Sequence, residues 1–276
     1  MDPVADHSTK GILHADAGRL KYKLSRYEPA DALRIYIQHY WAVEWDLRGQ
    51  EPYRQTVLSH PNVNLVFEPE RTRIYGIWEK TSTQLLEGQG SVFAVKFNPG
   101  GFYPFWRQPL SALTRRSIAL SDVFGAEAGL LEADILAAAG DAAAQVERIN
   151  RFFLARLPDE DENVELVNGI VAALVTDLDI LKVEQLADRF DLSVRTLQRL
   201  FDRYVGVNPK GVIQRFRLHE AAERIEQGEA VDWPKLSLDM GYFDQAHFIK
   251  DFKAYLGKTP DEYMRSIPSA KPDSLR

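Results

Sequence analysis

The chain of 276 residues contains no cysteine. A disulfide, a thiolate zinc site and a cysteine nucleophile are therefore excluded, and with them alkyl transfer to sulfur. Histidine is scarce, at six residues, and no His-x-His pair occurs. A metal site needs three or four converging ligands. The possible metal ligands are scattered along the sequence, so we expect no metal site and no other cofactor. These residues are His39, His60, Glu44 and Glu68.

Long apolar runs are also missing. No stretch reaches the roughly 18 apolar residues of a membrane span. The first residues, MDPVADHSTKG, lack the basic and apolar regions of a signal peptide, so we expect a cytoplasmic protein. The net charge of −6 argues against indiscriminate coating of nucleic acid, although a local basic face can still dock to DNA. The length allows two domains.

The first half of the chain has the composition of strands. Four segments are rich in β-branched and aromatic residues and are separated by glycine and proline: 34–45, 56–67, 73–78 and 91–97. This spacing predicts a β-rich barrel or sandwich-like domain. The first segment could instead begin as a helix at Asp31.

The pattern becomes helical from about Ser121, so the predicted fold class is α+β. A helix is expected over residues 141–157, and its apolar side could pack on the protein's own sheet or form a dimer seam: Val146, Ile149, Phe152 and Phe153. An acidic stretch follows. We predict an N-terminal sensor or dimerisation domain over residues 1–157, a linker over 158–163, an all-α domain over 164–268 and a tail over 269–276.

A basic island lies in the second half. Residues 193–217 hold six Arg or Lys and one acid, Asp202. Apolar residues recur in this segment at helical spacing, so they share one side of a helix. Arg, Gln and Thr lie on the opposite side, the front, which suits insertion into a DNA groove. A shorter helix over 182–190 and a three-residue turn precede it, with Ser193 placed as the N-cap. This order predicts a helix-turn-helix unit, HTH1, over residues 182–205.

The same order returns further along the chain. A short helix over 233–240 is followed by Gly241, by the N-cap candidate Asp244 and by a second basic helix. We predict a second unit, HTH2, over residues 233–256. His219 and Glu220 lie on the long helix between the units and are expected to face solvent.

SVRTLQRLFDRYVGVNPKGVIQRFRLHEAAERI and MGYFDQAHFIKDFKAYLGKTPDEYM together resemble the DNA-binding domain of AraC/XylS-family transcription regulators. The resemblance implies a bipartite reader of double-stranded DNA that recruits or hinders RNA polymerase. The second unit departs from the family at Leu238-Asp239-Met240, where small residues are usual. The residues expected at the DNA are Ser193, Arg195, Thr196, Gln198, Arg199, Arg203, Asp244, Gln245, His247 and Lys250.

The first half resembles, more loosely, the sensor domain of some members. Tyr40-Trp41, the strand NLVF and KFNPGGFYPF carry this likeness. It implies a module that binds a small effector or forms a homodimer. Lys96, opposite the apolar face of its strand, could be exposed or could meet an anionic ligand. The candidate ligand residues are Trp41, Trp78, Lys96, Phe102 and Trp106.

The function predicted from the sequence is a DNA-binding transcription regulator without enzymatic activity. Two alternatives stay open: an architectural DNA-binding protein indifferent to sequence, and a metal-dependent barrel enzyme fused to a DNA reader. The sequence does not distinguish activation from repression.

Overall fold

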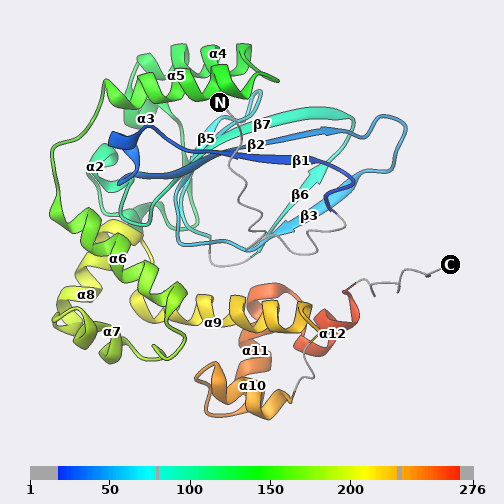
Figure 1. Cartoon of the computed structure of the whole chain (residues 1–276), viewed down its shortest axis with the longest axis vertical. Helices are drawn as coiled ribbons and strands as arrows, with labels where there is room; N and C mark the ends of the chain where they lie inside the picture. Colours follow the sequence, from blue (N-terminus) through cyan, green and yellow to red (C-terminus); the bar gives the residue numbers. More distant parts are fainter. Residues whose placement is uncertain (1–17, 79–80, 229–231, 268–276) are drawn as a thin grey trace.

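The structure is a computed structural model that describes residues 18–78, 81–228 and 232–267. Its N-terminal half holds two antiparallel sheets (Figure 1). The six-stranded sheet has the order β1 (Lys23–Tyr27), β2 (Ile37–Asp46), β7 (Gln89–Phe97), β4 (Asn64–Phe67), β5 (Arg73–Tyr75) and β8 (Ser117–Ile118). The second sheet pairs β3 (Tyr53–Val57) with β6 (Ser82–Leu86). Among the described residues β1 and β8 do not pair, so the predicted α+β fold is confirmed with a sandwich-like arrangement and no closed barrel.

The predicted strands at residues 34–45 and 91–97 correspond to β2 and β7. β2 and β7 pair over nearly their whole lengths, in register from His39↔Lys96 to Asp46↔Gln89. A 3₁₀ turn, η1 (Asp31–Leu33), precedes β2, so the alternative helical start at Asp31 is present for three residues only. The predicted strand over 56–67 is in fact two segments, because Pro61 interrupts the chain between β3 and β4.

One face of the large sheet is covered by α4 (Glu127–Ala137) and α5 (Ala142–Leu154), as Figure 1 shows. Val146, Ile149 and Phe153 are buried there, with the Phe153 ring centroid 5.7 Å from that of Phe97 on β7. The apolar side of α5 therefore packs on the protein's own sheet. The short elements before these helices are α2 (Tyr103–Trp106), η2 (Leu110–Leu113) and α3 (Ser121–Phe124).

The C-terminal half is helical. Its elements are α6 (Glu162–Thr176), α7 (Val183–Arg189), α8 (Val194–Leu200), η3 (Phe201–Val205), α9 (Pro209–Glu226), α10 (Trp233–Asp239), α11 (Gln245–Leu256) and α12 (Pro260–Arg265). Asp161 caps α6 through the amide of Asn163, so the helix already includes the last two residues of the expected linker. Within the described ranges, no helix is long and apolar enough to cross a membrane.

The hydrophobic core does not stop at the predicted linker. One cluster of buried side chains runs from the large sheet through α4 and α5 into α6, α7, α8 and η3. A second cluster fills HTH2 and includes Leu58 from the loop after β3. In Figure 1 the β3–β6 ribbon lies between the large sheet and α9. The two helix-turn-helix units thus contact the N-terminal half through different cores.

Candidate nucleic-acid interface

The recognition helix of HTH1 is α8, continued by the π-turn η3. Ser193 caps it, because its hydroxyl accepts from the amide of Thr196 at 3.1 Å. Leu197 and Phe201 are fully buried on the inner side. The opposite side is exposed along its length and holds the predicted front: Arg195, Thr196, Gln198, Arg199 and Arg203. The Thr196 hydroxyl is 2.8 Å from that of Ser193, so both hydroxyls already serve the cap.

A hollow of about 670 Å³ runs along this exposed side. Its wall consists mainly of the predicted front of α8 and η3. Pro109 from the N-terminal half and Asn163 from the first turn of α6 also line it. Any duplex that reaches the front of α8 must therefore pass close to the loop that follows α2.

The recognition helix of HTH2 is α11. Asp244 caps it through the amide of His247 at 2.8 Å, while Phe248 and Phe252 are fully buried behind it. His247 and Lys250 are exposed, and Gln245 is half-buried. Both units therefore have a capped helix with an apolar back and a polar front, as the sequence predicts. That the ten front and cap residues touch DNA stays a prediction.

His247 is held by its neighbours. Its Nε2 atom lies 3.3 Å from Oδ2 of Asp251, one turn later on α11. Gln214 of α9 donates from its side-chain amide to the same oxygen, and also to the Tyr242 hydroxyl at 3.1 Å. The Tyr242 ring stands edge-on to the imidazole, with centroids 5.3 Å apart. Sequence reasoning found His247 but missed Asp251, although the i,i+4 spacing signals the pair.

HTH1 is joined to the N-terminal half through α2 and the end of η2. The rings of Tyr103 and Tyr204 lie 4.4 Å apart, and the guanidinium of Arg203 lies over the Tyr103 ring. Thr114 donates from its hydroxyl to the backbone oxygen of Gly206 at 2.5 Å. Arg203, one of the predicted DNA contacts, is thus also a contact of the junction.

HTH2 is joined to the N-terminal half through buried polar groups. Arg215 of α9 donates to the carbonyl of Trp78 at 2.9 Å, and Tyr255 of α11 donates to the carbonyl of Ser59 at 3.0 Å. The expectation that His219 faces solvent is wrong, since its ring is 5% exposed and touches that of His60. Burial, with the nearby charges of Arg215 and Lys96, lowers the pKa of His219 to about 3.

Lys96 lies on the face of the large sheet opposite α4 and α5. It pairs in register with His39 of β2 and Asn64 of β4, two residues along the strand from Ala94. Burial, with the charge of Arg26 next, lowers the pKa of Lys96 to about 8. No carboxylate within the described ranges forms an ion pair with its ammonium group. Its charge also acts on His219 in the C-terminal half.

Not all of the other predicted ligand-binding residues lie near Lys96. Trp41 shares its face, because Trp41 pairs with Ala94, and its indole donates to Asn64 at 3.4 Å. Phe102 and Trp106 stack on each other and pack in the opposite core, where Phe102 is fully buried. Trp78 is 44% exposed, and its carbonyl accepts a hydrogen bond from Arg215 of α9. The structure therefore brings together two of the five.

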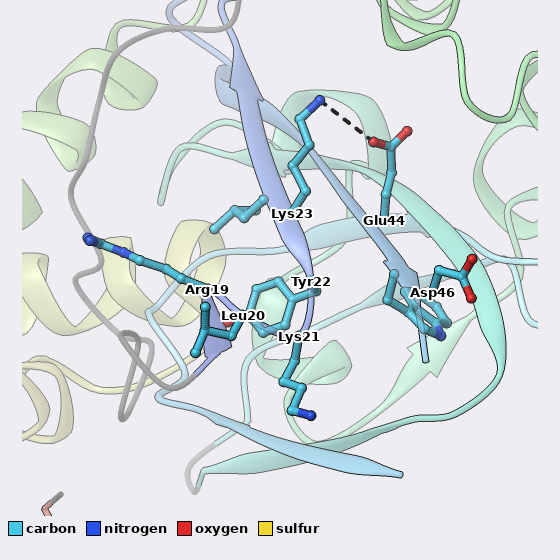
Figure 2. A pocket seen from close by; sticks show the side chains of 9 residues that line it. Arg19, Leu20, Lys21, Tyr22, Lys23, Glu44 and Asp46 are labelled. Carbon is cyan, nitrogen blue, oxygen red and sulfur yellow. Dashed lines mark ion pairs between the residues drawn. The ribbon is translucent and has the colours of Figure 1, made fainter. Parts of the chain in front are cut away.

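Figure 2 shows a separate hollow of about 440 Å³ at the edge of the sheet. The segment from Arg19 to Lys23 supplies its basic side chains and β2 its acidic ones, Glu44 and Asp46; Lys23 pairs with Glu44 at 3.9 Å. It contains none of the predicted DNA or ligand residues. In the part of the chain that is described, no group of three His, Asp or Glu is placed to hold a metal ion.

Comparison with protein families agrees with the division of the chain into a β-rich N-terminal half and a helical C-terminal half. Residues 186–266 match the family described as "Helix-turn-helix domain", and residues 25–119 match "Domain of unknown function (DUF6597)". The predicted helix-turn-helix domain in the second half of the chain is therefore confirmed.

Two curated relatives each match over part of this chain. An uncharacterized HTH-type transcriptional regulator of Haemophilus influenzae is 30% identical over 106 residues, 38% of this chain and 35% of the relative. The HTH-type transcriptional activator RhaS of Escherichia fergusonii is 30% identical over 108 residues, 38% of each chain. The chain thus spans a little over a third of the length of these relatives.

Two solved structures are similar at a low level. An AraC-type regulator from Chromobacterium violaceum is 22% identical, with a TM-score of 0.33, over 37% of this chain and 91% of that one. ToxT from Vibrio cholerae O395 is 10% identical, with a TM-score of 0.36, over 90% of this chain and 98% of that one.

Proposed function

We propose, from the helix-turn-helix family that residues 186–266 match, that this chain is a sequence-specific DNA-binding transcription regulator controlled by a small effector. One observation carries the proposal. Two capped helices, α8 and α11, each bury an apolar back and expose a polar, basic front, and α9 connects them. Two such helices can enter successive turns of one major groove, about 10 base pairs apart.

The residues of the two fronts have different tasks. Arg195 and Arg199 can each donate two hydrogen bonds to the edge of a guanine, and Gln198 can pair with adenine. Arg203, held over Tyr103, and Lys250 suit phosphates. Ser193, Asp244 and Thr196 serve mainly the caps, so their effect on DNA binding comes through helix ends that point at phosphates.

The effector that suits the structure is a small organic anion with an apolar body. Lys96 would supply its charge partner and Trp41 an aromatic surface on the same face of the sheet. Because Lys96 acts electrostatically on His219 in α9, an anion at Lys96 would change the field at the junction with HTH2. An effector shifts the equilibrium between two arrangements only if it binds them unequally.

RNA polymerase and a second copy of this chain are the partners that belong to such a regulator, and no catalytic step is part of the proposal. An architectural protein would bind all duplexes almost equally. A regulator should prefer its own sites by a factor of roughly 10³ or more.

The test is selection of bound duplexes from a random pool by the full chain at near-physiological salt. We expect a split motif with two half-sites about 10 base pairs apart. Arg199→Ala should relax one base pair of the first half-site. The matched control is Arg151→Ala on α5, an exposed arginine paired with Glu147, which should leave the motif unchanged. Enrichment of no sequence, with tight binding to all, would favour the architectural alternative.

The effector part has its own test. Monocarboxylates with aliphatic or aromatic bodies, each compared with its neutral amide, would be screened by the shift in melting temperature. Carboxylates should stabilise the wild type and fail to stabilise Lys96→Met, while amides should do neither. Equal stabilisation of Lys96→Met would place the anion elsewhere.

A further inference from the structure

The second recognition helix carries a side-chain network that the first does not. In HTH2 His247, one of the residues expected at the DNA, contacts Asp251, and Asp251 is in turn held by Gln214 from α9. Among the described residues, the exposed side chains of α8 have no comparable support from another helix, and Thr196 is tied to the cap. His247 thus has an orientation fixed by a neighbouring helix.

This network also decides which ring nitrogen carries the proton. A carboxylate only accepts hydrogen bonds, so a neutral imidazole whose Nε2 faces Asp251 keeps its hydrogen on Nε2. The remaining nitrogen, Nδ1, is then an acceptor. Within the described residues Nδ1 has no hydrogen-bond partner, and the side chain of His247 is 60% exposed. The network therefore presents a single acceptor on the front of α11.

A single acceptor distinguishes bases in the major groove. Adenine and cytosine offer an exocyclic amino hydrogen there, whereas guanine and thymine offer acceptors at the corresponding edge. An acceptor on the protein pairs with the first two and repels the others. A histidine with a mobile ring and an unfixed tautomer would accept either class.

We propose that Asp251 is a positioning residue that fixes His247 as a hydrogen-bond acceptor for an exocyclic amino group, of adenine or cytosine, in the second half-site. The inference rests on the proposed function, because it presumes that α11 enters a major groove. Gln214 of α9 donates a hydrogen bond to the carboxylate of Asp251 and so fixes the position of that carboxylate. Tyr242 limits the rotation of the ring from its other side.

The experiment compares selected DNA motifs for the full-length wild type and four variants: His247→Ala, Asp251→Ala, Asp251→Asn and the double alanine variant. In the wild type one position of the second half-site should carry adenine or cytosine. His247→Ala should reduce discrimination there by about ten-fold, the size of one lost base contact. Asp251→Ala should relax the same position and no other, because the ring loses its orientation.

Two comparisons separate positioning from a structural role. Asp251→Asn removes the charge but keeps a side-chain oxygen that can accept from Gln214 and face Nε2 of His247, so it should retain the wild-type base. The double variant should be no more relaxed than His247→Ala alone, since Asp251 acts only through the ring. A structural role would instead weaken binding to all sequences equally.

The outcomes are distinct. A wild type that selects a split motif in which the position sensitive to His247→Ala carries guanine or thymine would overturn the assignment of Nδ1 as an acceptor. Asp251→Ala with an unchanged motif would overturn the positioning role while the proposed function stands. A wild type that enriches no sequence would remove the proposed function and this inference together.

Discussion

The hydroxyl of Tyr255 donates a hydrogen bond to the backbone oxygen of Ser59 at 3.0 Å, across 196 residues of sequence. His219 Nε2 lies 2.7 Å from the same hydroxyl. A tyrosine hydroxyl has one hydrogen, and here it goes to Ser59, so His219 must be the donor in its own contact. A series of hydrogen bonds therefore leads from His219 of α9 through Tyr255 of the recognition helix α11 to Ser59 in the N-terminal half.

Tyr255→Phe is predicted to weaken this junction. The change leaves a buried ring nitrogen and a backbone oxygen without their partner, at a cost of about 1–3 kcal/mol. The measurement is the free energy of unfolding in urea. Tyr75→Phe is the control, because no hydrogen bond of the Tyr75 hydroxyl is present among the described residues. Equal stability of the two variants would mean that this series of hydrogen bonds contributes nothing.

His219 is predicted to make the protein sensitive to mild acid. Its pKa is lowered to about 3 in the fold and is near 6.5 in the unfolded chain. Between these values only the unfolded chain binds the proton, so the free energy of unfolding falls as pH drops below about 6.5. The slope reaches at most about 1.4 kcal/mol per pH unit.

The check is urea unfolding of the wild type and His219→Gln between pH 7.5 and 4.5. The glutamine amide can still donate to Tyr255, and the variant should lose less stability on acidification. If His219→Gln follows the wild type, the acid sensitivity has another source.

The features that could be predicted from the sequence depend on residues close to one another in the chain. Ser193 and Asp244 were expected as N-caps, and each accepts a backbone hydrogen bond from the third residue after it. Caps depend on the next few residues only, so one sequence suffices. The apolar spacing of α8 and α11 was equally local, and Leu197 and Phe248 are fully buried as expected.

Burial set by distant segments was not predictable in the same way. His219 has the spacing of an exposed helix residue, yet residues from the loop after β3 cover it. Lys96 has the alternation of a solvent-facing strand residue, and it lies near α9 instead. The shared core of HTH1 and the large sheet escaped prediction for the same reason. Only the tertiary arrangement brings these residues together.

Lys96 is predicted to make the protein more stable in mild alkali. Burial lowers its pKa from 10.5 to about 8, so between these values the unfolded chain binds more protons than the folded one. The free energy of unfolding therefore rises as pH increases from about 8 to 10.5. Lys96→Met should lack this rise and should be more stable than the wild type at pH 7, when both are free of effector. Lys235→Met, at an exposed lysine, should keep the wild-type pH profile; identical profiles for both variants would contradict the prediction.

Gly206 and Gly257 end the recognition helices of HTH1 and HTH2 with nearly the same backbone, at φ +86° and +81°. A methyl group costs about 1–2 kcal/mol in this left-handed conformation at either position. At Gly206 a Cβ atom would also lie 2.6 Å from the backbone oxygen of Leu110, whereas at Gly257 it would meet no atom within 4 Å. Gly206→Ala should therefore lower the free energy of unfolding clearly more than Gly257→Ala, as measured in urea. Equal losses would mean that η2, which begins at Leu110, does not dock on HTH1 in solution.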